Sequence, residues 1–87
     1  MEKTGHFATS KAGHDKDKLY VIVASDDKYV YLADGRYKTV LAPKKKSIKH
    51  IQIIHDKVED DLLQQIIDKK PHLDDAIQYI IKQKLTI

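Results

Sequence analysis

Basic side chains are concentrated in two stretches of this 87-residue sequence. The first, Ser10–Lys18, has a glycine near its centre where the backbone can turn, and the second, Pro43–Ile51, contains three consecutive lysines. Two further basic residues, Arg36 and Lys38, lie just before the second stretch. The candidate phosphate-binding residues are therefore Lys11, His14, Lys16, Lys18, Arg36, Lys38, Lys44, Lys45, Lys46, Lys49 and His50. Lysine ammonium groups bind phosphate oxygens and release counterions, so these residues predict salt-dependent binding of a nucleic-acid backbone.

The residue types also indicate how a nucleic acid would be recognised. Arg36 is the only arginine, and bidentate recognition of guanine edges depends mainly on arginine. We therefore expect recognition of the backbone and the shape of folded RNA. Tyr29, Tyr31 and Tyr37 are candidates for stacking on unpaired bases, although packing at the rim of a small domain, with the hydroxyl group in water, is the favoured role for them.

Charge is distributed unevenly along the chain. The formal net charge is +3, but residues 1–54 hold 11 basic against 6 acidic residues (+5), whereas residues 55–87 hold 5 against 7 (−2). A basic first half predicts an anionic partner for that half. Composition alone is equally compatible with a solvated surface that has a chance excess of lysine. For Lys44–Lys46, nucleic acid is favoured over a solvated face or a nuclear-localisation-like run.

Other kinds of chemistry have little support in the sequence. There is no cysteine, which excludes disulfides, thiol nucleophiles and thiolate zinc sites. The five histidines lack the spacing of a zinc enzyme, and there is no phosphate-binding glycine loop or nucleophile elbow. The acidic residues from Asp56 to Asp61 are interpreted as charges at a helix N-terminus. We therefore expect no enzymatic activity, no cofactor and no metal site.

The composition also predicts a cytoplasmic location. Small secreted domains usually need disulfides, which this sequence cannot form. The first six residues contain no apolar segment of a secretory signal. No apolar run approaches the roughly 18 residues that a membrane-spanning helix requires. We therefore expect a soluble protein with no membrane partner.

Five short segments with the composition of β-strands must position the basic residues. They are rich in β-branched and aromatic residues and are separated by turn-type clusters such as Asp34-Gly35. The expected strands are Gly5–Thr9, Leu19–Ala24, Tyr29–Ala33, Tyr37–Leu41 and Ile48–Ile53. Their spacing, roughly 8–12 residues, is typical of a small all-β barrel. Ser10–Lys18 would then be a loop that joins neighbouring strands.

The periodicity of the apolar residues changes in the last third of the chain. Apolar residues from Val58 to Ile67 recur at helical spacing, Pro71 prevents a smooth continuation, and a second helix is expected to begin at Asp74. The sequence therefore predicts a mainly β protein, with a barrel over residues 1–54 and a C-terminal helical hairpin over residues 55–87.

Two roles are open for the helical extension. Its apolar faces would pack against the barrel and enlarge a small core, which is favoured because a lone hairpin of short helices is unstable in water. Alternatively, the face formed by Ile77, Ile80 and Ile81 would dock a protein partner.

The segment from Gly5 to Val23 resembles the KOW motif of small SH3-like barrels in RNA-binding and ribosomal proteins. In that motif a glycine loop carrying a lysine or arginine connects two apolar strands. Pro43–Ile51 is similar to the basic segment before the last strand in KOW-domain proteins of the archaeal and eukaryotic large ribosomal subunit, and in their small bacterial relatives. The residues that match the motif are Gly5, Phe7, Gly13, Lys16 and Val21.

The resemblance covers roughly residues 5–54 and implies a five-stranded SH3-like barrel. It implies a non-catalytic protein that contacts ribosomal RNA through the phosphate backbone, as a ribosomal protein or a ribosome-associated factor. Asp17 stands where the family usually has a second glycine, so Lys44–Lys46 are expected to supply more of the binding than the loop. The competing class is a protein-interaction adaptor that uses the same barrel, with the helical extension as a second docking element.

Overall fold

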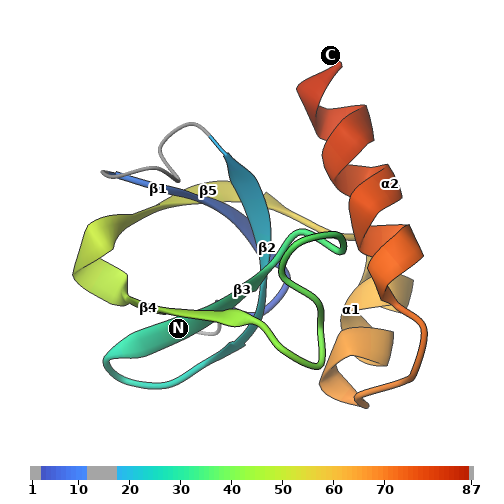
Figure 1. Cartoon of the computed structure of the whole chain (residues 1–87), viewed down its shortest axis with the longest axis horizontal. Coiled ribbons are helices and arrows are strands. Elements are labelled where there is room, and N and C mark those ends of the chain that lie inside the picture. The colour runs from blue at the N-terminus through green and yellow to red at the C-terminus, as the bar shows by residue number, and fades with distance from the viewer. Residues whose placement is uncertain (1–2, 12–17, 87) are drawn as a thin grey trace.

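A computed structural model describes residues 3–11 and 18–86 of the chain. These residues form one antiparallel sheet of five strands, with two helices on one side of it (Figure 1). The strands are β1 (His6–Ser10), β2 (Leu19–Ser25), β3 (Tyr29–Ala33), β4 (Lys44–Ser47) and β5 (Ile51–Lys57), in the spatial order β4-β3-β2-β1-β5. The prediction of a mainly β chain with five strands and a helical C-terminal part is confirmed.

The sheet is strongly curved, and each of its faces covers a separate apolar cluster (Figure 1). Successive side chains of a strand point to opposite faces, so Ala8 pairs with Tyr20 on one face and Phe7 pairs with Val21 on the other. The concave face holds a cluster built entirely from the sheet and its connections: Ala8, Tyr20, Ile22, Val30, Leu32 and Ile51. The outer face contributes to a second cluster, which the helices complete.

The end strands β4 and β5 follow each other directly in the chain, joined by the single 3₁₀ turn η1 (Ile48–His50). The Ile48 N–H donates to the carbonyl of Lys28 at 2.9 Å, and the Lys11 N–H donates to the carbonyl of His50 at 3.0 Å. The predicted strand Ile48–Ile53 is therefore only partly correct. Its first half is the 3₁₀ turn, and the strand itself continues past residue 54.

The predicted strand Tyr37–Leu41 is wrong. Residues 34–43 form an irregular loop, and the next strand in the chain is β4, which begins at Lys44 and pairs with β3. The Asp34 Oδ1 accepts the backbone N–H groups of Arg36 at 2.8 Å and Lys38 at 2.9 Å. A side chain therefore satisfies backbone donors that a neighbouring strand would otherwise satisfy, and it overrides the β propensity of the segment.

Helices α1 (Asp60–Ile67) and α2 (Asp74–Leu85) pack on the outer face of the sheet. Ile77 and Ile81 of α2 are buried there, and Ile80 packs against the same cluster, so this face of α2 contacts the core. Both helices carry two acidic residues in the first turn, which complement the helix dipole. Neither helix is long and apolar enough to cross a membrane, within the part of the chain that the structure describes.

Candidate nucleic-acid interface

The three consecutive lysines form an edge strand, and strand geometry divides them between two faces. Lys44 pairs with Leu32 and Lys46 with Val30, whereas Lys45 pairs with Tyr31. Because Val30 and Leu32 belong to the concave cluster, Lys44 and Lys46 lie on the concave side and Lys45 on the opposite side. The run is therefore not one continuous basic surface.

Lys44 differs from the other two lysines in its surroundings. Burial lowers the pKa of the Lys44 ammonium group from its ordinary value, and the nearby charge of Lys46 lowers it further. Desolvation disfavours the charged form of any amine, and Lys44 is half-buried whereas Lys45 is exposed. Lysine is also common in edge strands, where it opposes aggregation between sheets. Lys45 is the exposed lysine of the three, so it is the strongest candidate for RNA contact in this strand.

Lys45 lies next to an aromatic side chain. Its Nζ is 4.3 Å from the centroid of the Tyr29 ring, and Tyr29 is 37% exposed. Tyr29 and Tyr31 alternate with buried residues along β3, so both share the face of Lys45. Asp26 closes the preceding turn by accepting the N–H groups of Lys28 and Tyr29, which lowers the pKa of its carboxyl group. A cation and aromatic rings therefore occupy one face of the β3–β4 pair.

A second combination of cations and an aromatic ring lies in the loop of residues 34–43. Tyr37 is 72% exposed. The Arg36 guanidinium carbon is 5.2 Å from the Tyr37 ring centroid, and the Lys18 Nζ is 6.0 Å from it. Residues at the start of β2 and in this loop thus meet at one aromatic ring, an arrangement that suits both phosphate and base contacts. Lys38 is exposed in the same loop.

Helix α2 holds this loop in place. The Asp74 Oδ1 accepts the Val40 N–H at 2.9 Å, and the Gln78 Nε2 donates to the carbonyl of Gly35 at 2.8 Å. Gly35 has a φ of 80°, and a Cβ there would collide with the backbone carbonyl oxygen of Asp74. Only glycine allows the loop to approach the helix this closely. The helical extension therefore determines where Arg36 and Tyr37 lie.

The two basic stretches meet at η1. The hydrogen bond from Lys11 to His50 joins the end of β1 to this turn, and Lys11, Lys49 and His50 are all exposed. His14 and Lys16 lie outside the described residues, as does the rest of the loop of residues 12–17. Among the described residues, the structure thus brings together cations from both predicted stretches.

Lys82, Asp74 and Gln78 were not among the sequence-based candidates. Lys82 lines the same groove as Lys18 and Arg36, and Asp74 and Gln78 position the loop that carries Arg36. No local motif marks these residues, because each contact joins positions far apart in the sequence. Within the described residues there is no group of three or more side chains suited to hold a metal ion.

No protein-family model matches this sequence, and no curated protein matches it. The function is therefore inferred from the residues and their geometry.

Proposed function

We propose that this chain is a non-catalytic, cytoplasmic RNA-binding protein with a KOW-type SH3-like barrel, which contacts ribosomal RNA through its phosphate backbone as a ribosomal or ribosome-associated protein. The observation that carries the proposal is the meeting of exposed basic residues from separate stretches. Lys11 is hydrogen-bonded to His50 beside Lys49, and Lys18 meets Arg36 at Tyr37. Within the described residues, no salt bridge neutralises these cations, so they can bind phosphates.

Charge reversal of Lys45 tests the proposal. Lys45→Glu removes an exposed cation beside Tyr29 and adds a repulsive charge, so binding of ribosomal RNA in a filter assay should weaken roughly three- to tenfold. Lys70→Glu is the matched control, because Lys70 is exposed between the two helices and outside the predicted site. Equal weakening by both variants would show that only net charge matters and would contradict a localised interface.

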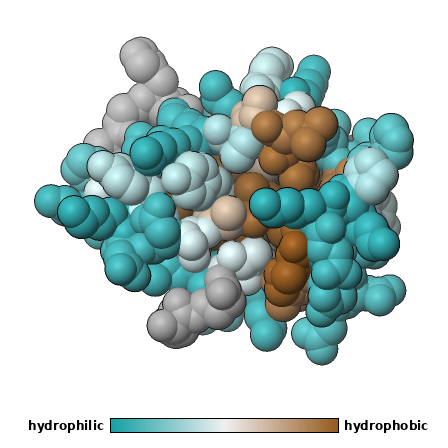
Figure 2. All heavy atoms as spheres, turned by 90° about the horizontal axis from the view of Figure 1, so that it is seen from below, coloured by the Kyte–Doolittle hydropathy of each residue, from teal (hydrophilic) through white to brown (hydrophobic). Residues whose placement is uncertain are grey.

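A second candidate function is a protein-interaction adaptor, and exposed apolar residues favour it. Figure 2 shows hydrophobic atoms exposed on the side of the molecule where the helices lie. Leu41 is 95% exposed and Ile67 is 51% exposed, and both line a hollow between the loop and α1. Exposed apolar groups that share a hollow are typical of protein-binding surfaces.

Co-sedimentation with ribosomes distinguishes the two functions. RNA contact predicts that Lys45→Glu reduces the ribosome-bound fraction and that Leu41→Ser leaves it unchanged. If Leu41→Ser reduces the ribosome-bound fraction and Lys45→Glu does not, the ribosome is bound through a protein contact. Ile77 is unsuitable for this comparison, because it is completely buried and its substitution would destabilise the fold.

A further inference from the structure

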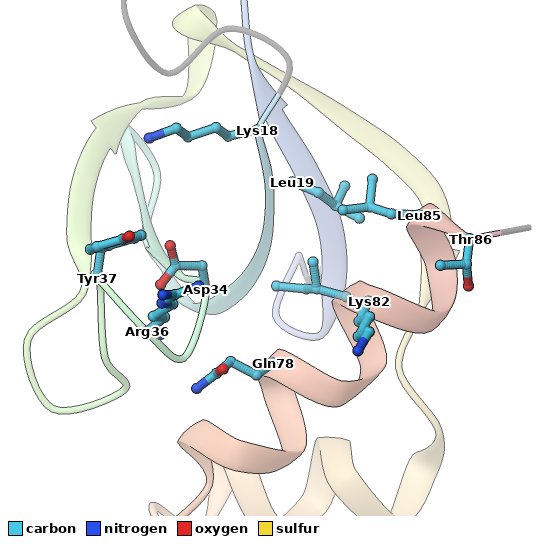
Figure 3. Close-up of a pocket in the computed structure, with 10 residues that line it drawn as sticks. Lys18, Leu19, Asp34, Arg36, Tyr37, Gln78, Lys82, Leu85 and Thr86 are labelled. Carbon is cyan, nitrogen blue, oxygen red and sulfur yellow. Dashed lines mark hydrogen bonds between the residues drawn. The ribbon is translucent and has the colours of Figure 1, made fainter.

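A groove of about 470 Å³ lies between the loop of residues 34–43 and helix α2. Figure 3 shows Tyr37 on one side of this groove, with Leu19 and Leu85 on the other. Ile81 adds to the apolar lining. The volume falls within the range of about 300–1,000 Å³ that is typical of small-ligand sites. The groove can therefore accept a group the size of a nucleotide.

The polar groups of the groove are mostly cationic. Lys18, Arg36 and Lys82 line it, against the single carboxylate of Asp34 among its lining residues. The Asp34 Oδ1 already accepts two backbone N–H groups of its own loop. Lys18 extends from the start of β2 toward Tyr37 (Figure 3). The occupant should therefore combine a flat apolar part with a negative charge.

One further group is placed to recognise a polar edge. The Gln78 Nε2 donates to the carbonyl of Gly35, which fixes the orientation of the amide. Gln78 also lines the groove, and its Oε1 remains an acceptor for an amino group of the occupant. An aromatic ring, an amide acceptor and cations at the rim match the chemistry of a nucleobase with its phosphate.

We propose that this groove binds a single unpaired nucleotide of the RNA, with the base against Tyr37 and Leu85 and the phosphate near Arg36 and Lys18. The inference rests on the proposed RNA-binding function and adds to backbone contact a specific site for a nucleotide outside the double helix. Unpaired bases are available for stacking on aromatic side chains, whereas bases within a duplex are not. The site explains why a helix outside the sheet holds the loop that carries Tyr37.

The test uses two RNA hairpins that differ only in one unpaired 2-aminopurine nucleotide in the stem. The full-length wild-type protein should bind the bulged hairpin about tenfold more tightly, which corresponds to one base–aromatic stack. The fluorescence of the 2-aminopurine should change when the base stacks on Tyr37. Tyr37→Ala should abolish both the preference and the fluorescence change, so that this variant binds the two hairpins with equal affinity.

Tyr79→Ala is the matched control, because Tyr79 is 65% exposed on α2 and does not line the groove. It should retain the preference for the bulged hairpin. Equal wild-type affinity for the two hairpins would overturn the nucleotide site and leave the proposed backbone binding intact. Equal weakening of both hairpins by Tyr37→Ala would also overturn the site, and absence of binding to either hairpin would overturn both proposals.

Discussion

Asp34 and Gly35 show how single residues shape the candidate interface. The Asp34 carboxylate accepts two N–H groups of its own loop and so folds the backbone that carries Arg36 and Tyr37. Gly35 then brings this loop against Asp74 of α2, where a Cβ would not fit. An acidic residue within a basic surface therefore has a structural role that supports the neighbouring cations.

The ion pair between Lys84 and Asp56 gives a prediction at the residue scale. Lys84 Nζ donates to Asp56 Oδ2 at 2.6 Å, and this bond lowers the pKa of the Asp56 carboxyl group below its ordinary value of 3.8. A carboxyl group with a lower pKa in the folded state stabilises the fold above its unfolded pKa, and this stabilisation is lost as the pH falls through the folded pKa. Asp56→Asn should therefore lower the melting temperature slightly at pH 7, because the Asp56 side chain is 63% exposed and solvent screens the pair.

Thermal unfolding at neutral pH and near pH 2 checks this expectation, since the wild type and Asp56→Asn should converge once the carboxyl group is protonated. Asp27→Asn is the control, because Asp27 is an exposed turn residue. A difference between Asp56→Asn and the wild type that persists unchanged at low pH would contradict the role of the ion pair.

At the scale of elements, α2 both completes the core and positions a loop. Its buried face places Ile77 and Ile81 against the outer face of the sheet. Its first turns supply Asp74 and Gln78, which hold the loop of residues 34–43. Loss of α2 packing should consequently disturb both the stability of the fold and the position of Tyr37.

Ile77→Ala tests the contribution of α2 to stability. Ile77 is completely buried, so its truncation should lower the free energy of unfolding by about 2–5 kcal/mol, the usual cost of such a cavity. Urea denaturation followed by circular dichroism measures this change. Tyr79→Ala on the exposed side of α2 should have little effect, and comparable destabilisation by the two variants would show that Ile77 does not anchor the helix.

At the scale of the whole molecule, the change from a basic to an acidic charge balance along the chain lies close to the change from strands to helices. The first 54 residues, with a balance of +5, supply four of the five strands, the start of β5 and most of the cations of the candidate interface. The remaining residues, with a balance of −2, supply both helices, which lie together on the outer face of the sheet (Figure 1). An RNA should therefore approach the sheet and its loops more readily than the exposed side of the helices.

The salt dependence of RNA binding tests this charge-driven association. If three to five phosphates are neutralised, a plot of log affinity against log salt concentration should have a slope of about −2 to −4.5. Filter binding over a series of monovalent salt concentrations gives this slope. An affinity that does not fall with added salt would remove the electrostatic basis of the proposed function.

The sequence predicted the parts of the fold that depend on local patterns. The bounds of β3 match its apolar segment, and the start of α2 matches its paired acidic residues. The failure at Tyr37–Leu41 also has a local cause, because the Asp34 side chain competes with strand pairing. Lysines disfavour strands, so the edge strand over Lys44–Ser47 was not expected from propensity.

The sequence by itself determined the mainly β composition, the two helices and the basic character of the first half of the chain. Only the tertiary structure decided which of these cations lie near one another. The pairing of β4 with β3 placed Lys45 on one face and Lys44 on the other, and the packing of α2 placed Lys82 in the same groove as Arg36. These contacts depend on strand register and helix packing, which are set by interactions between distant residues and leave no local pattern.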